Sequence, residues 1–399
     1  MNSRKSIVLE QRLAWPLLCA LVFTIPWEKS LIVPGVGTIT RLLGWTAAAA
    51  VILVVLLRRR LRTPNPALVA LALFSVWSAL TFFWSIDPPA SAARALTFLQ
   101  LLVMVWLVWE LAVTPNRQRT LIAAFVAGAI VSSSLTLLRF VRDLETYYRR
   151  YAAAGFEPND LGLTVALAIP LALHLASERR RYLPWLWRAA AALAIAAVLL
   201  SASRTALIVS LLAFLLPVWT WRAADHLHRA SVVMLFSLLV LGALFLAPSS
   251  SRQRLATLPQ EITQGTLHNR TQIWKAGLKV FRRRPVIGMG VGAYPAAVRP
   301  WLGVPGRPGH QYVAHNTYLS VLVESGLVGF TLFSITALLL AVFVWVMPSM
   351  PRALWAVMLL ACGTGIVALT WEHRKPLWLI AALIMTEWAR SFSRPDGET

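Results

Sequence analysis

Two arginines and one histidine, Arg204, Arg270 and His315, have the side chains that chemistry on an anionic substrate requires. The guanidinium of arginine is a planar fork of N–H donors that matches phosphate oxygens in two-point contacts. Histidine has an ordinary pKa of about 6.5, so its imidazole can accept a proton near neutral pH. Each also has a plainer interpretation, because a polar residue at the end of a membrane span often simply reaches the interface. We favour a functional role for Arg204 because it closes a span on the outer side, where basic residues are disfavoured.

Arg270 and His315 lie in the only long polar segment of the chain, residues 248–324. The segment contains ten Lys and Arg residues and, before the next apolar run begins, a single acid, Glu261. Its first part, residues 248–314, is predicted to be one large periplasmic loop. We interpret this loop as a basic element held over a lipid-linked, anionic substrate.

A helix is predicted inside this loop, because Asn269 followed three residues later by Gln272 is typical of a helix N-terminus. The helix should run from Arg270 to about Arg284. Its basic and apolar residues fall on different faces, which predicts an amphipathic helix with its apolar side on the membrane. The glycines of residues 288–292 follow, and we interpret them as a turn rather than a phosphate cradle.

No metal site and no cofactor are predicted. His310 lies five residues before His315, but no nearby cluster of carboxylates completes a metal site. The outer side also lacks a pair of acids of the Asp-x-Asp kind, so arginines would have to neutralise a leaving group. Asp160 opens an apolar run, and we interpret it as an acid favoured by the helix dipole.

The elements that must position these residues are membrane helices. The 399-residue chain is 58% hydrophobic and only 14% charged, and a span needs roughly 20 mostly apolar residues. The continuously apolar runs exclude the alternating pattern of a β-barrel. The chain is therefore predicted to be an all-α polytopic membrane protein, a single transmembrane domain over residues 1–399 with about 12 spans. These are expected near residues 13–26, 36–57, 67–84, 93–113, 120–141, 160–177, 184–200, 205–221, 232–247, 326–347, 353–370 and 376–389.

Much of the net charge of +22 is explained by membrane topology rather than by a nucleic-acid partner. Cytoplasmic loops collect Lys and Arg, and every loop assigned to the inside in this scheme is basic. The scheme places both termini in the cytoplasm and the long loop, between spans nine and ten, in the periplasm. Topology does not explain a group of basic residues at the outer ends of spans. They include Arg139, Arg142, Arg149, Arg150, Arg204, Arg374 and Lys375.

Four short motifs resemble those of the O-antigen ligase family, which shares its loop domain with O-antigen polymerases and bacterial O-linked oligosaccharyltransferases. The motifs cover roughly residues 155–330. They are Ser-x-Ser-Arg at 201–204, Arg270-x-x-x-Trp274, Pro285-x-x-Gly288-x-Gly290, and His315-Asn316-x-Tyr318 before Glu324-x-Gly326.

This resemblance implies a membrane glycosyltransferase of the GT-C type in the bacterial inner membrane, multi-pass and active on the periplasmic face. The donor would be a glycan on undecaprenyl diphosphate, and the acceptor a sugar of the lipid A core oligosaccharide. The essential residues of the family correspond here to Arg204, Arg270 and His315. His315 would act as the base and the two arginines would bind the diphosphate, with inversion at the anomeric carbon.

Other residues are weaker candidates for contact with the diphosphate or the acceptor. They are Arg142, Arg149, Arg150, Lys275, Asn316 and Tyr318. An O-antigen polymerase or a protein O-oligosaccharyltransferase would use the same donor, so both stay open as alternatives. A transporter is less favoured, because the predicted spans hold almost no ionisable residues near mid-membrane.

Overall fold

Helices form most of the computed structural model, which describes residues 2–35, 37–143, 150–177, 183–221, 224–246, 270–302 and 312–392. The α-helices are α1 (Asn2–Leu9), α2 (Trp15–Thr24), α3 (Ile39–Arg58), α4 (Pro66–Leu80), α5 (Pro88–Leu111), α6 (Pro115–Arg142), α7 (Pro158–Ser177), α8 (Leu183–Ser201), α9 (Arg204–Ala213), α10 (Leu215–Trp219), α11 (His226–Leu241), α14 (Arg270–Phe281), α15 (Tyr294–Val298), α16 (Thr317–Val346), α17 (Ser349–Ala368) and α18 (Lys375–Phe392). Short 3-10 or π turns are η1 (Glu10–Ala14), η2 (Ile25–Ser30), η3 (Thr81–Trp84), η6 (Gly242–Leu246) and η8 (Arg299–Trp301). Two-residue strands β1 (Ile32–Val33) and β2 (Gly37–Thr38) pair antiparallel, with Ile32 opposite Thr38.

All twelve predicted apolar runs are helical, which confirms the all-α polytopic fold. Ten helical segments in the described part of the chain are long and apolar enough to cross a membrane. The other two predicted runs correspond to the shorter helix Arg204–Trp219 and to α18. Of the predicted loop 248–314, the structure describes residues 270–302 and 312–314.

Side-chain caps explain why many of these helices begin where they do. A Ser, Thr, Asn or Asp side chain just before the helix accepts a hydrogen bond from an amide of the first turn, which has no helical partner. Caps of this kind precede α4, α5, α6, α9, α11 and α16, and are formed by Asn65, Asp87, Thr114, Ser203, Asp225 and Asn316.

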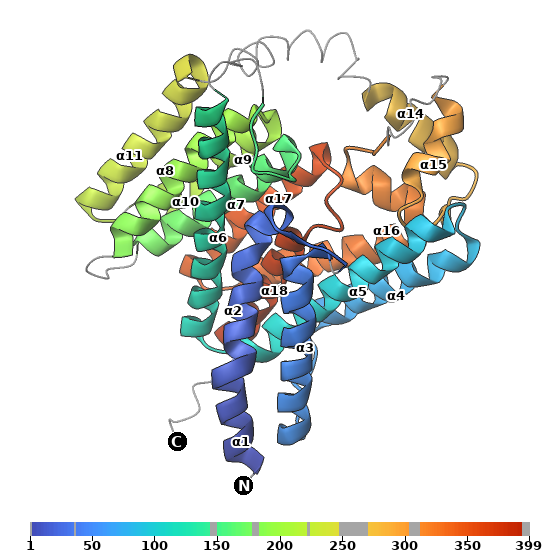
Figure 1. Cartoon of the computed structure of the whole chain (residues 1–399), viewed down its shortest axis with the longest axis horizontal. Coiled ribbons are helices and arrows are strands. Elements are labelled where there is room, and N and C mark those ends of the chain that lie inside the picture. The colour runs from blue at the N-terminus through green and yellow to red at the C-terminus, as the bar shows by residue number, and fades with distance from the viewer. Residues whose placement is uncertain are drawn as a thin grey trace.

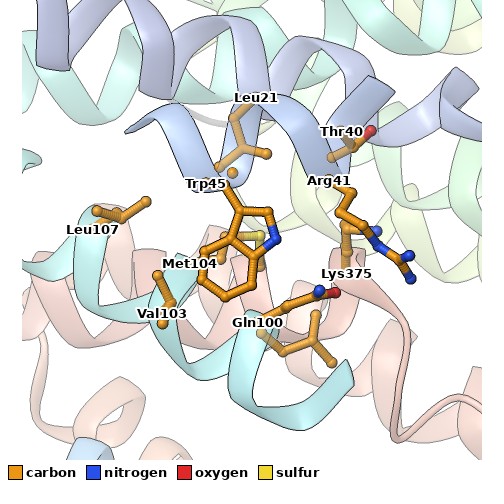
Figure 2. Close-up of a pocket in the computed structure, with 11 residues that line it drawn as sticks. Leu21, Thr40, Arg41, Trp45, Gln100, Val103, Met104, Leu107 and Lys375 are labelled. Carbon is orange, nitrogen blue, oxygen red and sulfur yellow. The ribbon is translucent and has the colours of Figure 1, made fainter. Parts of the chain in front are cut away.

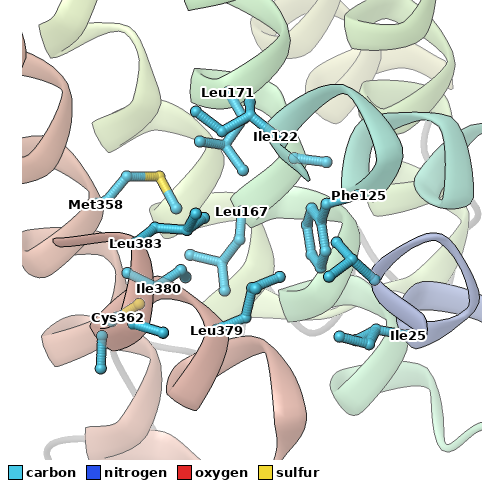
Figure 3. Packing of buried hydrophobic residues seen from close by; sticks show 14 of the residues in the cluster. Ile25, Ile122, Phe125, Leu167, Leu171, Met358, Cys362, Leu379, Ile380 and Leu383 are labelled. Atoms are coloured by element: carbon cyan, nitrogen blue, oxygen red, sulfur yellow. The ribbon is translucent and has the colours of Figure 1, made fainter. Parts of the chain in front are cut away.

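The core lies around α7, which is the most completely buried of the membrane-length helices. Figure 3 shows Leu167 and Leu171 of α7 between Phe125 of α6 and Leu383 of α18. Helices in a membrane associate mainly by close van der Waals packing. Small residues permit it: a side chain at Gly128 of α6 would meet the Phe23 carbonyl oxygen at 2.0 Å.

The long helix α16 is interrupted at Gly326, where the backbone adopts φ 66° and ψ −169°. The break separates a short first part, beginning at Thr317, from the long apolar part that was predicted as a span. Residues with a side chain rarely adopt a positive φ of this kind, so glycine suits this position. A side chain at Gly326 would also meet the carbonyl oxygen of Val286 at 2.2 Å.

The glycine-rich run 288–292 lies against this break and is a series of turns, as predicted. Gly288, Gly290 and Gly292 all have positive φ. The amide of Gly290 donates to the Glu324 carbonyl (2.9 Å), and that of Gly292 donates to the Glu324 carboxylate (2.8 Å). The run is therefore closed by an acid of the protein itself rather than open to a phosphate.

The amphipathic helix α14 begins at Arg270 as predicted but ends at Phe281, three residues early, and its predicted cap Asn269 lies outside the described residues. Its apolar face does not rest on the membrane, and that part of the prediction is wrong. Ala276 and Val280 pack instead in a small core with Tyr294, beside α15 and α16. Figure 1 shows α14 and α15 at the end of the molecule opposite the start of α1.

Candidate active site

His315 lies directly before α16, at the point where the chain returns from α14 and α15 to the membrane helices. Its backbone φ is 46°, in the left-handed region that non-glycine residues adopt only at a cost. On its amino-terminal side, the indole of Trp274 donates to the carbonyl of Ala314 (2.8 Å). On the other side Asn316 caps α16, with its Oδ1 accepting from the Leu319 amide (3.0 Å). His315 is therefore fixed between two anchored neighbours.

Arg270 is brought to His315 by the same anchor. Arg270 and Trp274 are four residues apart in α14, so they lie on one face of the helix. Trp274 is bonded to the residue before His315, which places the first turn of α14 against the histidine. The motif spacing of Arg270 and Trp274 thus has a physical reason: one residue carries the charge and the other fixes it in place.

Burial, and after it the positive charge of Arg270, lower the pKa of His315 to about 4, although the charge of Asp160 opposes the shift. The imidazole is consequently neutral at physiological pH and can accept a proton. Because both charges act on the ring, the fold brings together residues from α14, α7 and the start of α16. Only Arg270 and His315 were expected to act together from the sequence.

The carboxylate of Asp160, in the first turn of α7, contacts side chains from three distant positions in the chain. Its Oδ2 contacts the guanidinium of Arg374 and lies 3.4 Å from Nζ of Lys29, and its Oδ1 accepts from the indole of Trp371 (3.1 Å). The amides of the helix start are instead capped by Glu157, whose Oε2 accepts from the Asp160 amide (3.1 Å). The interpretation of Asp160 as a simple helix-end acid was therefore incomplete.

The segment between α17 and α18, which carries Trp371 and Arg374, is itself hydrogen-bonded to the start of α16. The Trp371 amide donates to Oγ1 of Thr317 (2.7 Å), which itself donates to the carbonyl of Leu369 (2.8 Å). Next to it, the buried carboxylate of Glu372 accepts from Arg94 (3.1 Å) and from Ser320 (3.2 Å). Arg374 and the start of α16 are thus parts of one hydrogen-bonded unit.

Arg204 is the first residue of α9 and follows the turn 201–203, in which Ala202 has a φ of 51°. The turn packs closely on α7, because a side chain at Gly162 would meet Oγ of Ser201 at 2.8 Å. Gly162 is two residues after Asp160. Arg204 therefore begins its helix beside the same end of α7 that carries Asp160.

The weaker candidates are placed in different ways. Arg150 is held by Ser201 and Asn159, with its Nε donating to the Ser201 carbonyl (3.0 Å) and its Nη2 to Oδ1 of Asn159 (2.6 Å). Through these contacts Arg150 stabilises the turn before Arg204. Arg142, at the end of α6, is exposed, and Arg149 lies outside the described residues.

The remaining candidates are on α14 and α16. Lys275 is exposed on α14, and Asn316 is occupied as a helix cap. Tyr318 lines a cavity of about 140 Å³ between α4, α16, α17 and α18, together with apolar residues such as Phe333 and Trp378. Tyr318 follows His315 by three residues in the chain.

A second, smaller pocket is lined in part by Lys375, the first residue of α18. Figure 2 shows Arg41 and Lys375 on one side of this pocket and Val103 and Leu107 on the other. Lys375 also pairs with Glu28 (2.5 Å). The described residues contain no group of three or more His, Cys, Asp or Glu side chains that could hold a metal ion.

The arrangement defines a polytopic helical membrane protein with a cationic site, containing one neutral histidine, at the end where α14 lies. Residues 189–334 match the protein-family model described as O-Antigen ligase, the family that the sequence motifs resemble. Arg204, Arg270 and His315 fall within the matched residues, whereas Asp160 and Arg374 fall outside them.

The chain is also similar to a protein whose name refers to exopolysaccharide production rather than to O-antigen ligation. The exopolysaccharide production protein ExoQ of Rhizobium meliloti (strain 1021) is 26% identical over 276 residues, which is 65% of this chain. The match covers 61% of the length of ExoQ.

Proposed function

We propose that the protein is an O-antigen ligase that transfers a glycan from undecaprenyl diphosphate to a sugar of the lipid A core. The reaction would take place on the periplasmic face of the bacterial inner membrane. The observation that carries the proposal is a neutral, half-buried histidine beside Arg270 and the Asp160–Arg374 pair, at the membrane end where the family motifs meet. This is the combination that acceptor deprotonation and diphosphate departure require.

In this mechanism His315 removes the proton from an acceptor hydroxyl. The hydroxyl oxygen attacks the anomeric carbon, the bond from that carbon to the diphosphate oxygen breaks, and its electron pair leaves with the diphosphate. Arg270 and Arg204 would stabilise the negative charge that develops there. Since the enzyme supplies no carboxylate nucleophile in this scheme, the single displacement inverts the anomeric configuration.

Donor binding would also strengthen the base. An anion close to an imidazole favours its protonated form and raises its pKa. In the free protein Arg270 pushes the His315 pKa in the opposite direction. A bound diphosphate would offset that charge, so His315 would become a better proton acceptor once the donor is in place.

The cavity next to Tyr318 supports a lipid-linked donor. It is lined almost entirely by apolar side chains of membrane helices, including Phe74 and Leu340, and it starts beside the first turn of α16. An isoprenoid chain in this cavity would leave its diphosphate near His315. We assign the donor to this side of the α17–α18 segment for that reason.

A second candidate, polymerisation of an exopolysaccharide, is favoured by the similarity to ExoQ. It would use the same donor chemistry with another lipid-linked glycan as acceptor. Purified protein should be given a lipid-linked glycan together with either lipid A core or a second lipid-linked glycan. Transfer to the lipid A core supports the ligase, transfer to the second lipid-linked glycan supports the polymerase, and transfer to neither overturns both.

A further inference from the structure

An exposed apolar surface lies where α4 ends and the chain turns through η3 into α5. Phe83 of η3 is 79% exposed, and its neighbour Phe82 and the following Ile86 are exposed as well. The basic residues 58–62 precede the other end of α4, and the predicted topology assigns them to the inside. The η3 end of α4 therefore belongs to the outer side, close to the boundary between hydrocarbon and headgroups.

The turn that follows α14 is bonded to η3 and continues this surface. Nη1 of Arg284 donates to the carbonyl of Trp84 (3.0 Å), and the indole of Trp84 donates to the carbonyl of Ile287 (3.2 Å). The amide of Ile86 donates to the carbonyl of Met289 (3.1 Å). These bonds hold the turn at the level of η3. The exposed apolar residues of the joint surface are Phe82, Phe83, Ile86, Val286 and Ile287.

Three consecutive exposed arginines, residues 282–284, border the apolar residues. Residues 270–302 contain seven Lys and Arg residues and no Asp or Glu. Within the described residues, none of the three arginines forms an ion pair with a carboxylate. Arg283 lies over the ring of Trp301 (4.5 Å), and Asp87, the acid next to Ile86, accepts instead from the Ala90 amide as the cap of α5 (3.2 Å). The positive charge of this turn therefore faces outward without a counterion from these residues.

We propose that η3 and residues 282–287 form one interfacial surface that binds the anionic headgroups of the bilayer. The apolar side chains would enter the outer part of the hydrocarbon, and the arginines would contact lipid phosphates. Apolar and basic side chains next to each other are what binding to a membrane surface uses. A soluble polyanion would meet the same arginines but leave the apolar residues in water, which favours the bilayer.

This surface would fix the height of α14 over the membrane, whatever reaction the protein catalyses. The surface begins directly after Phe281, the last residue of α14, and Arg270 is the first residue of the same helix. Anchoring one end of α14 on headgroups would therefore hold Arg270 at a set distance from the lipid surface.

Photocrosslinking of the full-length protein in nanodiscs of equal parts phosphatidylglycerol and phosphatidylcholine tests this. Val286→benzoylphenylalanine captures the molecule that contacts the surface, and mass spectrometry of the crosslinked peptide identifies it. We expect phosphatidylglycerol to be captured at least about fivefold more often, the contribution of one basic residue near an anionic surface. Ile52→benzoylphenylalanine, at an exposed position inside α3, is the matched control and should capture both lipids equally.

Removing charge decides whether the arginines cause this preference. Arg282→Gln combined with Arg283→Gln retains the bond from Arg284 to η3 and should bring the capture ratio at position 286 close to one. Arg59→Gln combined with Arg60→Gln removes two exposed charges at the inner end of α3 and should leave the ratio unchanged. Added salt should lower the ratio in the parent protein, because it screens exposed charges.

Three results would overturn the proposal. One is equal capture of the two lipids at position 286. Another is capture of no lipid, with crosslinks only to a second copy of the chain or to an added soluble anionic polysaccharide. The third is a preference for phosphatidylglycerol that neither the double variant nor salt reduces.

Discussion

Lowering the pH is the most direct perturbation of His315. With a pKa of about 4, about 97% of the imidazole is neutral at pH 5.5, whereas an ordinary histidine of pKa about 6.5 would be only about 9% neutral. The shift comes from burial and from Arg270, so it belongs to the folded, donor-free protein. A lowered pKa means that the active, neutral form persists as pH falls and is lost only near pH 4.

The assay is transfer from a lipid-linked glycan by purified protein between pH 3.5 and 8. The acid limb of kcat/KM reports the free enzyme and that of kcat the donor-bound enzyme. We expect the kcat/KM limb near pH 4 and the kcat limb at a higher pH, because the bound diphosphate offsets Arg270. His315→Ala should lower kcat by about 10²- to 10⁴-fold, the usual contribution of a general base.

The neighbouring charges provide the controls. Arg270→Gln removes a charge that lowers the His315 pKa, so the remaining activity should show its acid limb at higher pH. Asp160→Asn removes a charge that opposes the lowering and should move the limb the other way. Lys279→Gln, on the exposed side of α14, should leave the limb in place. A kcat/KM limb centred at pH 6.5, or an unchanged profile and rate in His315→Ala, would refute the assignment of His315 as the base.

Three further outcomes are expected. Gly326→Ala should destabilise the protein by about 1–3 kcal/mol in thermal unfolding, because of its positive φ and the Val286 oxygen, whereas Gly363→Ala, with open space around it, should change little; equal effects would contradict the contact. Glu324→Gln should also lower stability, by about 1–3 kcal/mol, since the two carboxyl oxygens accept from the Gly292 and Tyr294 amides and glutamine has an NH₂ group in place of one of them; a variant as stable as the parent would show that these bonds contribute little. Chelator should leave the transfer rate unchanged, and a loss of activity that Mg²⁺ or Mn²⁺ restores would overturn the metal-free mechanism.

Much of this molecule could be predicted because its signals are local. Apolar runs of membrane length identify the helices, and residues such as Ser203 and Asn316 mark where helices begin. The motifs around Arg204, Arg270 and His315 lie within short stretches that can be matched one by one. The break at Gly326 was not predicted, although Gly326 belongs to one of the motifs, because the Val286 carbonyl that lies against it comes from outside that motif.

Contacts between residues far apart in the chain could not be predicted from the sequence. Asp160 meets Lys29 across 131 residues and Arg374 across 214, and no spacing rule connects them. Arg374 was recognised only as a positive charge that topology does not explain. The apolar face of α14 was assigned to lipid for a related reason. Its packing partner Tyr294 comes from a later helix, and the sequence does not reveal this contact. An amphipathic pattern indicates that a face is buried but does not identify what covers it.

The pairing of Asp160 with Lys29 and Arg374 has a consequence for how an anion enters the site. Lys29 and Arg374 already pair with the Asp160 carboxylate, whose charge also acts on His315, so an incoming diphosphate that contacted these two cations would exchange with an internal counterion. An anion would bind at such a site only if it competes successfully with Asp160 for these cations. A ligand that offers no more negative charge than one carboxylate gains little by entering, whereas a diphosphate brings enough to displace Asp160 from its cations. Selectivity against the single phosphates of surrounding lipids would then follow from one aspartate.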